Sequence, residues 1–372
     1  YTSFTFYSGS QGVIITDTIM FFLFTIIAFI AGPYIMSSVG GWDQAITRLA
    51  TFELKPDIIA WHGMTGANAF WSTKTAALVW AVVLGFVWSA VVAVSPWQAS
   101  RYLMAKNEHV TLRAALIAPT CVLLLYVVLH FSAAAINLIK PDIAPSEKAY
   151  IWAAFNVLPT WMGVIMLGGI MAAALSSCST FLSLVGFSVS RDLIHESGDS
   201  EKVLRVSRIT MAFVGLATLG ITYFQPPAVM WIGYFAATLF AASWGPVAFA
   251  SVWSKRITAT GALWGIIGGF IAVALGETLK KYGGVDFPVY LRPPIIGAGF
   301  SVLCIIVGSA LTQVSDAERQ FREKLHIRPA GEGSAVEVSR TMTLAKTIAG
   351  LGVLTIIGVY YLYSVPYNAA LQ

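Results

Sequence analysis

The sequence of 372 residues is poor in charge and in cysteine. Charged residues make up 11% of it and hydrophobic residues 57%, whereas a soluble globular domain carries about 25% charged residues. With a mean hydropathy of +0.74, this deficit excludes an ordinary soluble domain and indicates an integral membrane protein. The three cysteines lie far apart in apolar runs and therefore form neither a disulfide framework nor a CxxC metal motif.

The groupings that mark a membrane enzyme are also missing. The five histidines make no HExxH or HxxxH pair. No paired acid and base, metal-ligand set or nucleophile constellation stands in the apolar runs, so we expect no enzymatic activity. The net charge of +5 does not indicate binding to nucleic acid, because the excess of cations falls in loops on one side of the membrane.

Long apolar runs are what the sequence does have. They are roughly 20 residues long, the length of a helix that crosses a bilayer, and they predict an all-α membrane protein. We expect residues 1–372 to form one transmembrane domain, with an extracellular loop at 40–74 and a charged cytoplasmic connector at 315–340. Nine spans are predicted at about 14–37, 75–95, 113–138, 159–188, 204–224, 227–252, 257–276, 293–312 and 343–364.

The distribution of Lys and Arg predicts the orientation. If the first span starts in the cytoplasm, 15 of the 23 cations lie inside and 8 outside. We therefore expect a multi-pass protein of the plasma or inner membrane, with its C-terminus outside. The sequence opens at Tyr1, in a polar aromatic segment just before a span, which leads us to expect an N-terminally truncated piece of a longer protein.

Two spans are expected to be interrupted by proline. Pro96 follows Ser95 at the end of the second span, and Trp97 and Gln98 come next. A broken helix frees backbone groups in the membrane, where transporters bind ions and solutes, although a plain proline kink is the alternative. Trp244-Gly245-Pro246 predicts a second break in the sixth span, with the same alternative.

The fourth span carries a stripe of small hydroxyl side chains on an otherwise apolar helix. At 100° per residue the stripe occupies one face. Clustered hydroxyls of this kind suit Na⁺, a hard cation that takes oxygen ligands, but small residues on a membrane helix also serve close packing. The face holds Ala173, Ser176, Ser177 and Thr180, with Ser179 and Ser183 at its edge.

A single carboxylate, Asp17, stands near the start of the first span. An acidic group in a span is costly to bury and is a functional candidate for that reason. The alternative is an interfacial residue that caps the start of a helix, since Thr16-Asp17 makes a good N-terminal pair.

Three stretches together resemble the sodium:solute symporter family. Ile15-Thr16-Asp17 before an apolar span resembles the family's TD segment, although the glycine pair that usually precedes it is only loosely kept here. The residues Arg101-Tyr102-Leu103 and Ala105-Lys106 after the broken helix resemble the family's Q-R-Y-L-x-A-K ending, with Ser100 in place of the glutamine. The most specific match is Ala172–Asp192, which is similar to the family's sodium-site helix.

This resemblance implies a LeuT-like fold built of two inverted five-helix repeats with peripheral helices. On that map the first span is the last helix of the first repeat, spans two to six are the complete second repeat, and spans seven to nine are peripheral. The first four core helices would be absent from the sequence, and with them part of the binding site. The resemblance thus implies that those N-terminal helices of the same protein are partners needed to complete it.

The resemblance also implies which residues bind Na⁺, the expected cofactor. The family's common sodium site falls on the backbone carbonyl of Ala173 and the hydroxyls of Ser176 and Ser177. A second site, found in some members, falls on Ser176 together with Asp17, Ser179 and Thr180.

The implied activity is Na⁺-coupled symport of a small organic solute by alternating access. Ser95, Trp97 and Gln98 are candidate solute contacts, and aromatic residues of the sixth span are weaker ones, namely Trp231, Tyr234 and Phe235. No Arg or Lys lies in mid-span, yet a half-helix N-terminus can hold a carboxylate, and we favour a carboxylate or zwitterion. The alternative function is a transporter-like sensor domain of a signalling protein.

Overall fold

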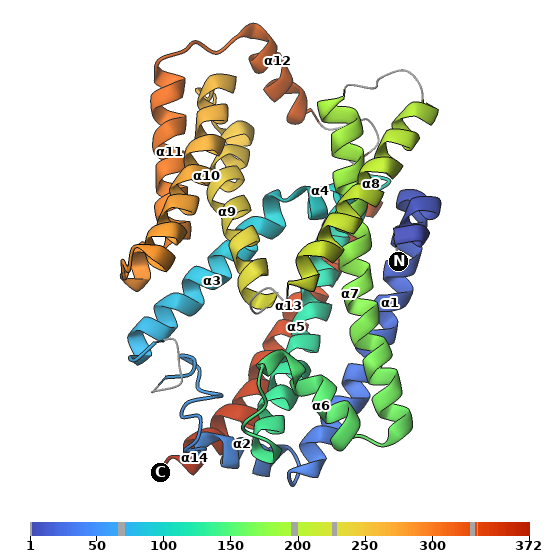
Figure 1. Cartoon of the computed structure of the whole chain (residues 1–372), viewed down its shortest axis with the longest axis vertical. Helices are drawn as coiled ribbons and strands as arrows, with labels where there is room; N and C mark the ends of the chain where they lie inside the picture. Colours follow the sequence, from blue (N-terminus) through green and yellow to red (C-terminus); the bar gives the residue numbers. More distant parts are fainter. Residues whose placement is uncertain (1, 66–70, 195–199, 225–228, 328–331, 333) are drawn as a thin grey trace. The chain divides into compact units, whose positions relative to one another are not determined.

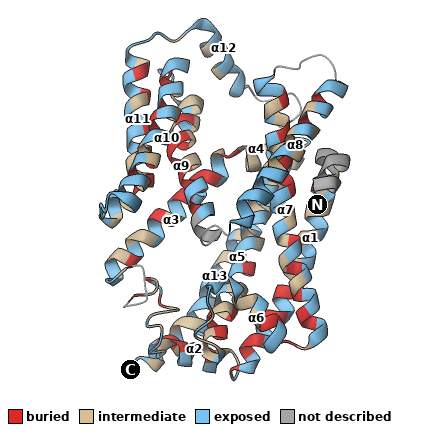
Figure 2. Cartoon of the chain, viewed as in Figure 1, coloured by how far each residue is buried: buried red, intermediate tan, exposed pale blue. Residues whose placement is uncertain are grey.

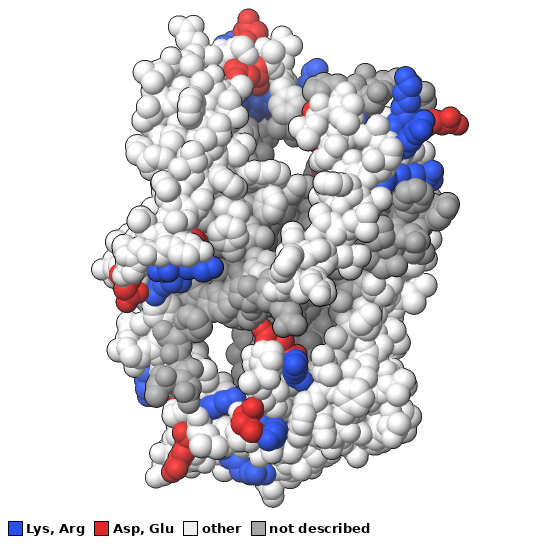
Figure 3. Space-filling view, in the orientation of Figure 1, with Lys and Arg blue, Asp and Glu red and all other residues white. Residues whose placement is uncertain are grey.

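The computed structural model describes residues 2–65, 71–194, 200–224, 229–327, 332 and 334–372. Within them the chain is helical, and nine helices are long and apolar enough to cross a membrane. On the face shown in Figure 3, charged side chains gather over helix ends and connecting segments, while the helix bodies carry few. The predicted all-α membrane class and the nine spans are confirmed.

The chain divides into two compact units, which we describe separately. Unit 1 comprises residues 1–59, 117–228 and 348–372, and unit 2 comprises residues 60–116 and 229–347. The helices α5 and α13 contribute residues to both units. The elements of unit 1, coloured along the chain in Figure 1, are α1 (Thr2–Ser38), α2 (Trp42–Ala50), α5 (Glu108–Ile139), α6 (Ala149–Asn156), α7 (Thr160–Ser188), α8 (Ser200–Tyr223), α13 (Ala335–Val359) and α14 (Val365–Ala370).

The remaining helices belong to unit 2. They are α3 (Lys74–Val94), α4 (Pro96–Leu103), α9 (Val229–Trp253), α10 (Ala259–Tyr282), α11 (Pro293–Ala310) and α12 (Asp316–Leu325). Short 3-10 helices at Ser146–Lys148 and Val289–Leu291 and π-type turns at Val189–Leu193 and Tyr360–Ser364 complete the chain. Figure 1 shows α9, α10 and α11 side by side, and Figure 2 shows their buried residues along the faces that meet.

In unit 1, helices α1, α5, α6 and α7 enclose an apolar core that contains Ile27, Ile35, Ile136 and Met166. A buried polar contact fixes α6 against α5: the hydroxyls of Ser132 and Tyr150 lie 2.7 Å apart. Burial raises the pKa of Tyr150 to about 12, so its phenol stays neutral and its hydroxyl donates to the carbonyl of Leu129 on α5.

In unit 2, glycines let the helices approach closely, which is the usual way in which membrane helices associate. A side chain at Gly269 of α10 would place its Cβ 2.7 Å from the carbonyl oxygen of Ala242 and 2.8 Å from the Cα of Ser243. Both of those residues lie on α9, so the two backbones are in contact there.

This contact explains why one predicted break is wrong. Helix α9 runs without interruption through Pro246. Proline has no N–H to donate to the carbonyl four residues earlier, which is that of Ala242. That carbonyl faces the backbone of Gly269 instead, and the hydroxyl of Ser301 on α11 donates to the carbonyl of Ser243 at 3.5 Å. The carbonyl that the proline leaves free is thus covered by the backbone of α10, and α11 adds a hydrogen bond to the next carbonyl of α9.

The other predicted break is confirmed. Helix α3 ends at Val94 and α4 begins at Pro96, with Ser95 between them in an extended conformation at φ −70° and ψ 142°. A residue before proline is pushed out of the helical region by the proline ring, and Ser95 takes that conformation at the end of the second span.

The charged segment predicted as a connector at 315–340 is partly helical. Ser315 and Glu318 form a capping box at the start of α12, and Glu318 reaches across to α10. One of its carboxylate oxygens accepts the N–H of Ala259 at 2.6 Å and the other accepts that of Ser315 at 2.6 Å. The hydrogen bond from Ala259 is the largest cause that holds the pKa of Glu318 below its ordinary 4.5.

We expect Gly269→Ala to destabilise the protein by about 1–3 kcal/mol, the usual cost of overpacking a tight contact, because the new methyl group would meet backbone atoms of α9. Thermal unfolding in detergent measures the effect as a lower midpoint. Gly299→Ala on α11 is the matched control, since no atom lies within 4 Å of a Cβ built there. Equal midpoints for the two variants would contradict this account of the α9–α10 contact.

We also expect α12 to loosen in acid. Because the pKa of Glu318 is depressed in the folded chain, its ionised form contributes stability that is present above pH 4.5 and is lost as the pH falls through the lower folded value. Hydrogen exchange of residues 313–327, corrected for intrinsic rates, should rise in that acidic range. Glu318→Gln should exchange faster already at neutral pH, whereas the exposed control Glu323→Gln should not; identical exchange in both would refute the link.

Candidate functional site

Asp17 lies inside α1, which begins at Thr2, so it does not cap a helix start. The alternative interpretation as an N-cap is therefore wrong. Its carboxylate is half-buried in a helix that is long and apolar enough to span a membrane. An acidic group in that position needs a partner on a neighbouring helix, because lipid offers none.

The hydroxyl stripe of α7 lies on a helix that packs against α1. Ser179 and Thr180 are 5% and 3% exposed, Ser176 is half-buried and Ser177 is exposed. The Ser179 hydroxyl donates to the carbonyl of Ser176 at 2.9 Å, and Ser183 does the same to Thr180 at 2.9 Å. Since each hydrogen is donated along the helix, the hydroxyl oxygen keeps its lone pairs for an external ligand.

The two helices bring Asp17 and Thr180 together. The Thr180 hydroxyl lies 3.3 Å from a carboxylate oxygen of Asp17 and 3.2 Å from the carbonyl oxygen of Ser176. Close packing further along the same pair of helices sets this register: a Cβ at Gly169 would lie 2.8 Å from the side chain of Ile27. The residues predicted for the second sodium site from α1 and α7 are therefore neighbours in unit 1.

The oxygens around Thr180 suit a monovalent cation. The Thr180 hydroxyl lies beside a carboxylate oxygen of Asp17 and the carbonyl oxygen of Ser176, and Ser176 and Ser179 add hydroxyls from the same helix. Oxygen-only ligands select hard cations, and the single negative charge of Asp17 balances one positive charge. The residues present thus fit a sodium ion.

The residues predicted for the common sodium site lie nearby on α7. The hydroxyl of Ser177 is 3.4 Å from the carbonyl oxygen of Ala173, one helical turn earlier. Ser177 is exposed and Ala173 is half-buried, so these oxygens lie on an accessible face of the helix. Ser176 belongs to both predicted sodium sites.

The predicted solute contacts lie in unit 2, at the break between α3 and α4. Ser95 is 4% exposed, and within the described residues its hydroxyl has no hydrogen-bond partner. Its carbonyl accepts the N–H groups of Gln98 and Ala99 at 3.2 and 3.0 Å. Trp97 and Gln98 are half-buried on the first turn of α4. A buried hydroxyl without a partner is costly, which marks Ser95 as a ligand-binding candidate.

The aromatic residues of α9 are placed differently from one another. Tyr234 is buried in an apolar cluster with Val87 and Val91 of α3, and its ring lies 5.3 Å from that of Trp80. Phe235 is exposed, and the side chain of Trp231 lies outside the described residues. Tyr234 therefore packs in the apolar interior of unit 2.

One buried cation was not singled out by the sequence. Arg292, at the start of α11, is 8% exposed; its guanidinium stacks on the ring of Trp71 at 4.4 Å and lies 3.6 Å from the carboxylate of Asp286. In the sequence it stands in a polar turn, which gives no sign of burial. Pro293-Pro294 indicates that a helix starts directly after Arg292, but this pattern does not indicate that the arginine is buried.

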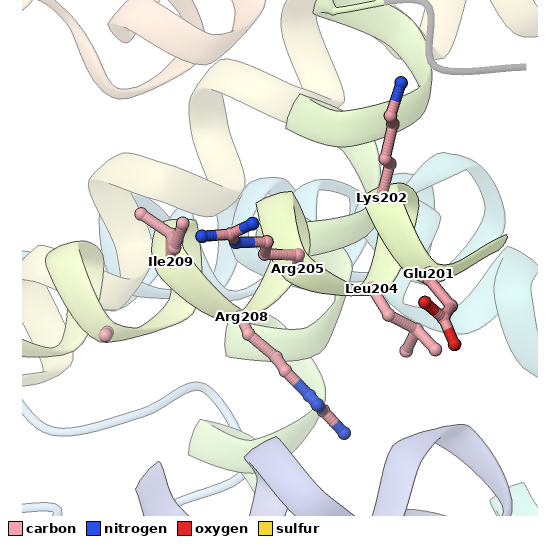
Figure 4. Close-up of a pocket in the computed structure, with 7 residues that line it drawn as sticks. Glu201, Lys202, Leu204, Arg205, Arg208 and Ile209 are labelled. Carbon is pink, nitrogen blue, oxygen red and sulfur yellow. The ribbon is translucent and has the colours of Figure 1, made fainter. Parts of the chain in front are cut away.

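In unit 1, a cavity of about 800 Å³ lies along α8 and is lined by residues of that helix. Figure 4 shows that Lys202, Arg205 and Arg208 project from one short stretch of that helix in different directions. Because these cations diverge, they do not form a site for a single anion. They belong to the excess of Lys and Arg that we predict on the cytoplasmic side.

Comparison with known proteins places the chain in a family. The model described as the sodium:solute symporter family matches residues 1–269. The sodium/proline symporter of Salmonella typhimurium is 24% identical over 331 residues, which is 86% of this chain and 62% of that protein. The sodium/pantothenate symporter of Haemophilus influenzae is 25% identical over 316 residues, covering 83% of this chain and 62% of that protein.

A solved structure shares the fold. It is the substrate-bound outward-open state of a Na⁺-coupled sialic acid symporter, with a TM-score of 0.62 and 20% identity over 84% of this chain and 65% of that one. The predicted LeuT-like architecture is confirmed by this likeness. The chain spans about 62% of the length of the curated relatives named above. Since the family model covers well over half of its residues, the chain belongs to the sodium:solute symporter family.

Proposed function

We propose that the protein containing this chain couples the entry of a small organic solute to that of Na⁺ by alternating access. Membership of the sodium:solute symporter family supports the coupling ion. The observation that carries the proposal is the approach of the Asp17 carboxylate to the Thr180 hydroxyl inside the spans. That pair supplies the negative charge and the oxygens that a sodium ion needs.

The second sodium site would use Asp17, Ser176, Ser179 and Thr180. The single hydrogen of the Thr180 hydroxyl has two acceptors within reach, the carboxylate of Asp17 at 3.3 Å and the carbonyl of Ser176 at 3.2 Å. A sodium ion at the carboxylate would turn that hydrogen to the carbonyl and leave the hydroxyl oxygen facing the ion. Binding would then cost no hydrogen bond, because one acceptor replaces the other.

The common sodium site would use the carbonyl of Ala173 and the hydroxyls of Ser176 and Ser177. These oxygens carry no net charge, so they need further ligands to replace the hydration shell of the ion. The chain spans 62% of its curated relatives, and we propose that helices outside these 372 residues supply the rest.

Two bound ions would make solute accumulation steeper. Each charge that crosses the membrane potential contributes about 2.3 kcal/mol per 100 mV. The coupling is reciprocal, so Na⁺ should raise the affinity for the solute by the same factor as the solute raises the affinity for Na⁺.

We propose a carboxylate-bearing solute or zwitterion as the substrate class. The named relatives act on proline and pantothenate, and the solved neighbour on sialic acid; all three compounds carry a carboxylate. In this chain the break at Ser95-Pro96 offers a buried hydroxyl at the start of α4. We assign the solute contact to Ser95, Trp97 and Gln98.

Replacement of Asp17 tests the second site. Asparagine can still accept the Thr180 hydrogen bond but has no charge, so Asp17→Asn should fold and lose one bound ion. The measurement is solute uptake by the full-length protein in vesicles, titrated with Na⁺ over a panel of carboxylates and zwitterions. We expect the Hill slope to fall from about two to about one.

Asp142→Asn is the matched control, because that carboxylate is exposed and paired with Lys140 at 2.8 Å. It should leave the slope unchanged. A wild-type slope of one that Asp17→Asn does not alter would remove the second site from the mechanism, and uptake independent of Na⁺ for every solute would sink the proposed function as a whole.

Replacement of Ser95 tests the solute contact. Ser95→Ala deletes a buried hydroxyl that has no partner in the described structure, so the unfolding midpoint should stay the same or rise slightly. The apparent solute affinity should fall about tenfold, which is about 1.4 kcal/mol. Ser132→Ala is the control: its hydroxyl is bonded to Tyr150, so this variant should lose stability and keep solute affinity. Loss of stability without loss of affinity in Ser95→Ala would argue for a structural role.

A further inference from the structure

Two grooves lie where α10 starts and α11 ends, on the predicted cytoplasmic side. They are far along the chain from the proposed transport residues. The first, of about 570 Å³, lies where α9 turns into α10 and α11 ends. Two cations stand at its rim, Lys255 and Arg256, and both are exposed. Its other lining residues are Ser254, Ile257, Ile305, Ile306, Ser309, Ala310, Thr312 and Val314.

Hydrogen bonds hold the turn that carries these cations. The hydroxyls of Thr258 and Thr312 lie 2.7 Å apart, the N–H of Thr258 donates to Ser309 at 3.3 Å, and that of Arg256 donates to Ser254 at 3.2 Å. The turn is therefore tied to the end of α11. Its shape is formed before any ligand binds, which reduces the entropy lost on binding.

The positive charge of the rim is not neutralised locally. Among the residues that the structure describes, neither Lys255 nor Arg256 takes part in an ion pair. The nearby carboxylate of Glu318 is already engaged by the N–H groups of Ala259 and Ser315. The rim therefore attracts an anion.

An apolar groove of about 400 Å³ adjoins the first, since Thr312 lines both. It follows the seam between α10 and α11. Trp264 on α10 and Leu311, directly after α11, form its sides, and Leu311 is 80% exposed. The remaining lining residues are Thr260, Leu303, Cys304, Val307 and Gly308.

Glycine contacts explain why the seam is hollow. A Cβ at Gly308 would lie 2.9 Å from the Cα of Gly261, so the two helix backbones touch there with no side chain between them. The larger side chains to either side then stand above a backbone floor. From Leu303 to Leu311 the groove runs about 12 Å at 1.5 Å per residue, close to the depth of one leaflet of a bilayer whose core is about 30 Å thick.

We propose that the two grooves together bind one anionic phospholipid of the cytoplasmic leaflet. The phosphate lies against Lys255 and Arg256, and one acyl chain lies along Trp264, Val307 and Leu311. Basic pockets between membrane helices on the cytoplasmic side are suited to acidic headgroups. A free anion would use only the rim. A zwitterionic lipid also carries a phosphate, but its ammonium group would lie beside Lys255 and Arg256 and oppose binding there, whereas an acidic lipid fits both grooves. This site is independent of the proposed transport function.

Native mass spectrometry of the full-length protein tests the site. The protein is titrated in detergent with phosphatidylglycerol or with phosphatidylcholine, and the retained lipid adducts are counted. We expect tighter retention of phosphatidylglycerol, and a decrease of about tenfold in the double variant Lys255→Gln/Arg256→Gln, with phosphatidylcholine unchanged. Lys280→Gln/Lys281→Gln, at the other end of α10, removes the same charge and should retain the wild-type preference.

Two further arms keep the test decisive. Glycerophosphoglycerol, the headgroup without acyl chains, should not compete; effective competition would show a free-anion site and overturn the assignment to a lipid. In vesicles, brominated phosphatidylglycerol should quench Trp264, measured as the difference between wild type and Trp264→Phe, more strongly than brominated phosphatidylcholine. Equal quenching by the two lipids, or equal adduct loss in both double variants, would refute the proposal.

Discussion

The hydrocarbon layer of a membrane offers no hydrogen bonds, and this constraint accounts for most of what the polar residues of the chain do. A hydroxyl inside a span must donate to the protein itself. Ser179, Thr180 and Ser183 do so by bonding to carbonyls of their own helix. The carboxylate of Asp17 cannot satisfy itself in this way, and it therefore lies against a hydroxyl of the neighbouring helix. What appears as a stripe of small residues in the sequence is in space an array of oxygens beside one negative charge.

Close packing supplies the register that such an array needs. Glycines allow close helix contacts, at Gly169 against the Ile27 side chain between α1 and α7 and at Gly269 against the backbone of α9. In the first case the contact fixes which residues of the two helices face each other further along. In the second it also shelters a carbonyl that Pro246 leaves without its helical donor. Small residues therefore have two roles here, since they position helices and they cover a carbonyl that a proline leaves free.

Much of this could be read from the sequence, because hydropathy and helix length are local properties. The nine spans, the break at Ser95-Pro96 and the helix at Asp316–Leu325 all follow from runs and motifs of a few residues. The continuity of α9 through Pro246 could not be read in this way. Pro96 and Pro246 look alike in the sequence, yet α9 continues through the second, where Gly269 and Ser301 of other helices pack against its backbone. The burial of Arg292 under Trp71 depends in the same way on residues distant in the chain.

The candidate site also shows what local sequence patterns cannot predict. The resemblance to a family predicted which oxygens bind Na⁺, and the structure shows that Asp17 of α1 and Thr180 of α7 are neighbours. A local sequence pattern could not show that the Thr180 hydroxyl has two acceptors at nearly equal distances. A hydroxyl balanced in this way can exchange acceptors without losing a hydrogen bond. At the sodium site that we propose, a cation that competes for one acceptor would therefore meet little resistance, which suits a site that both loads and releases its ion.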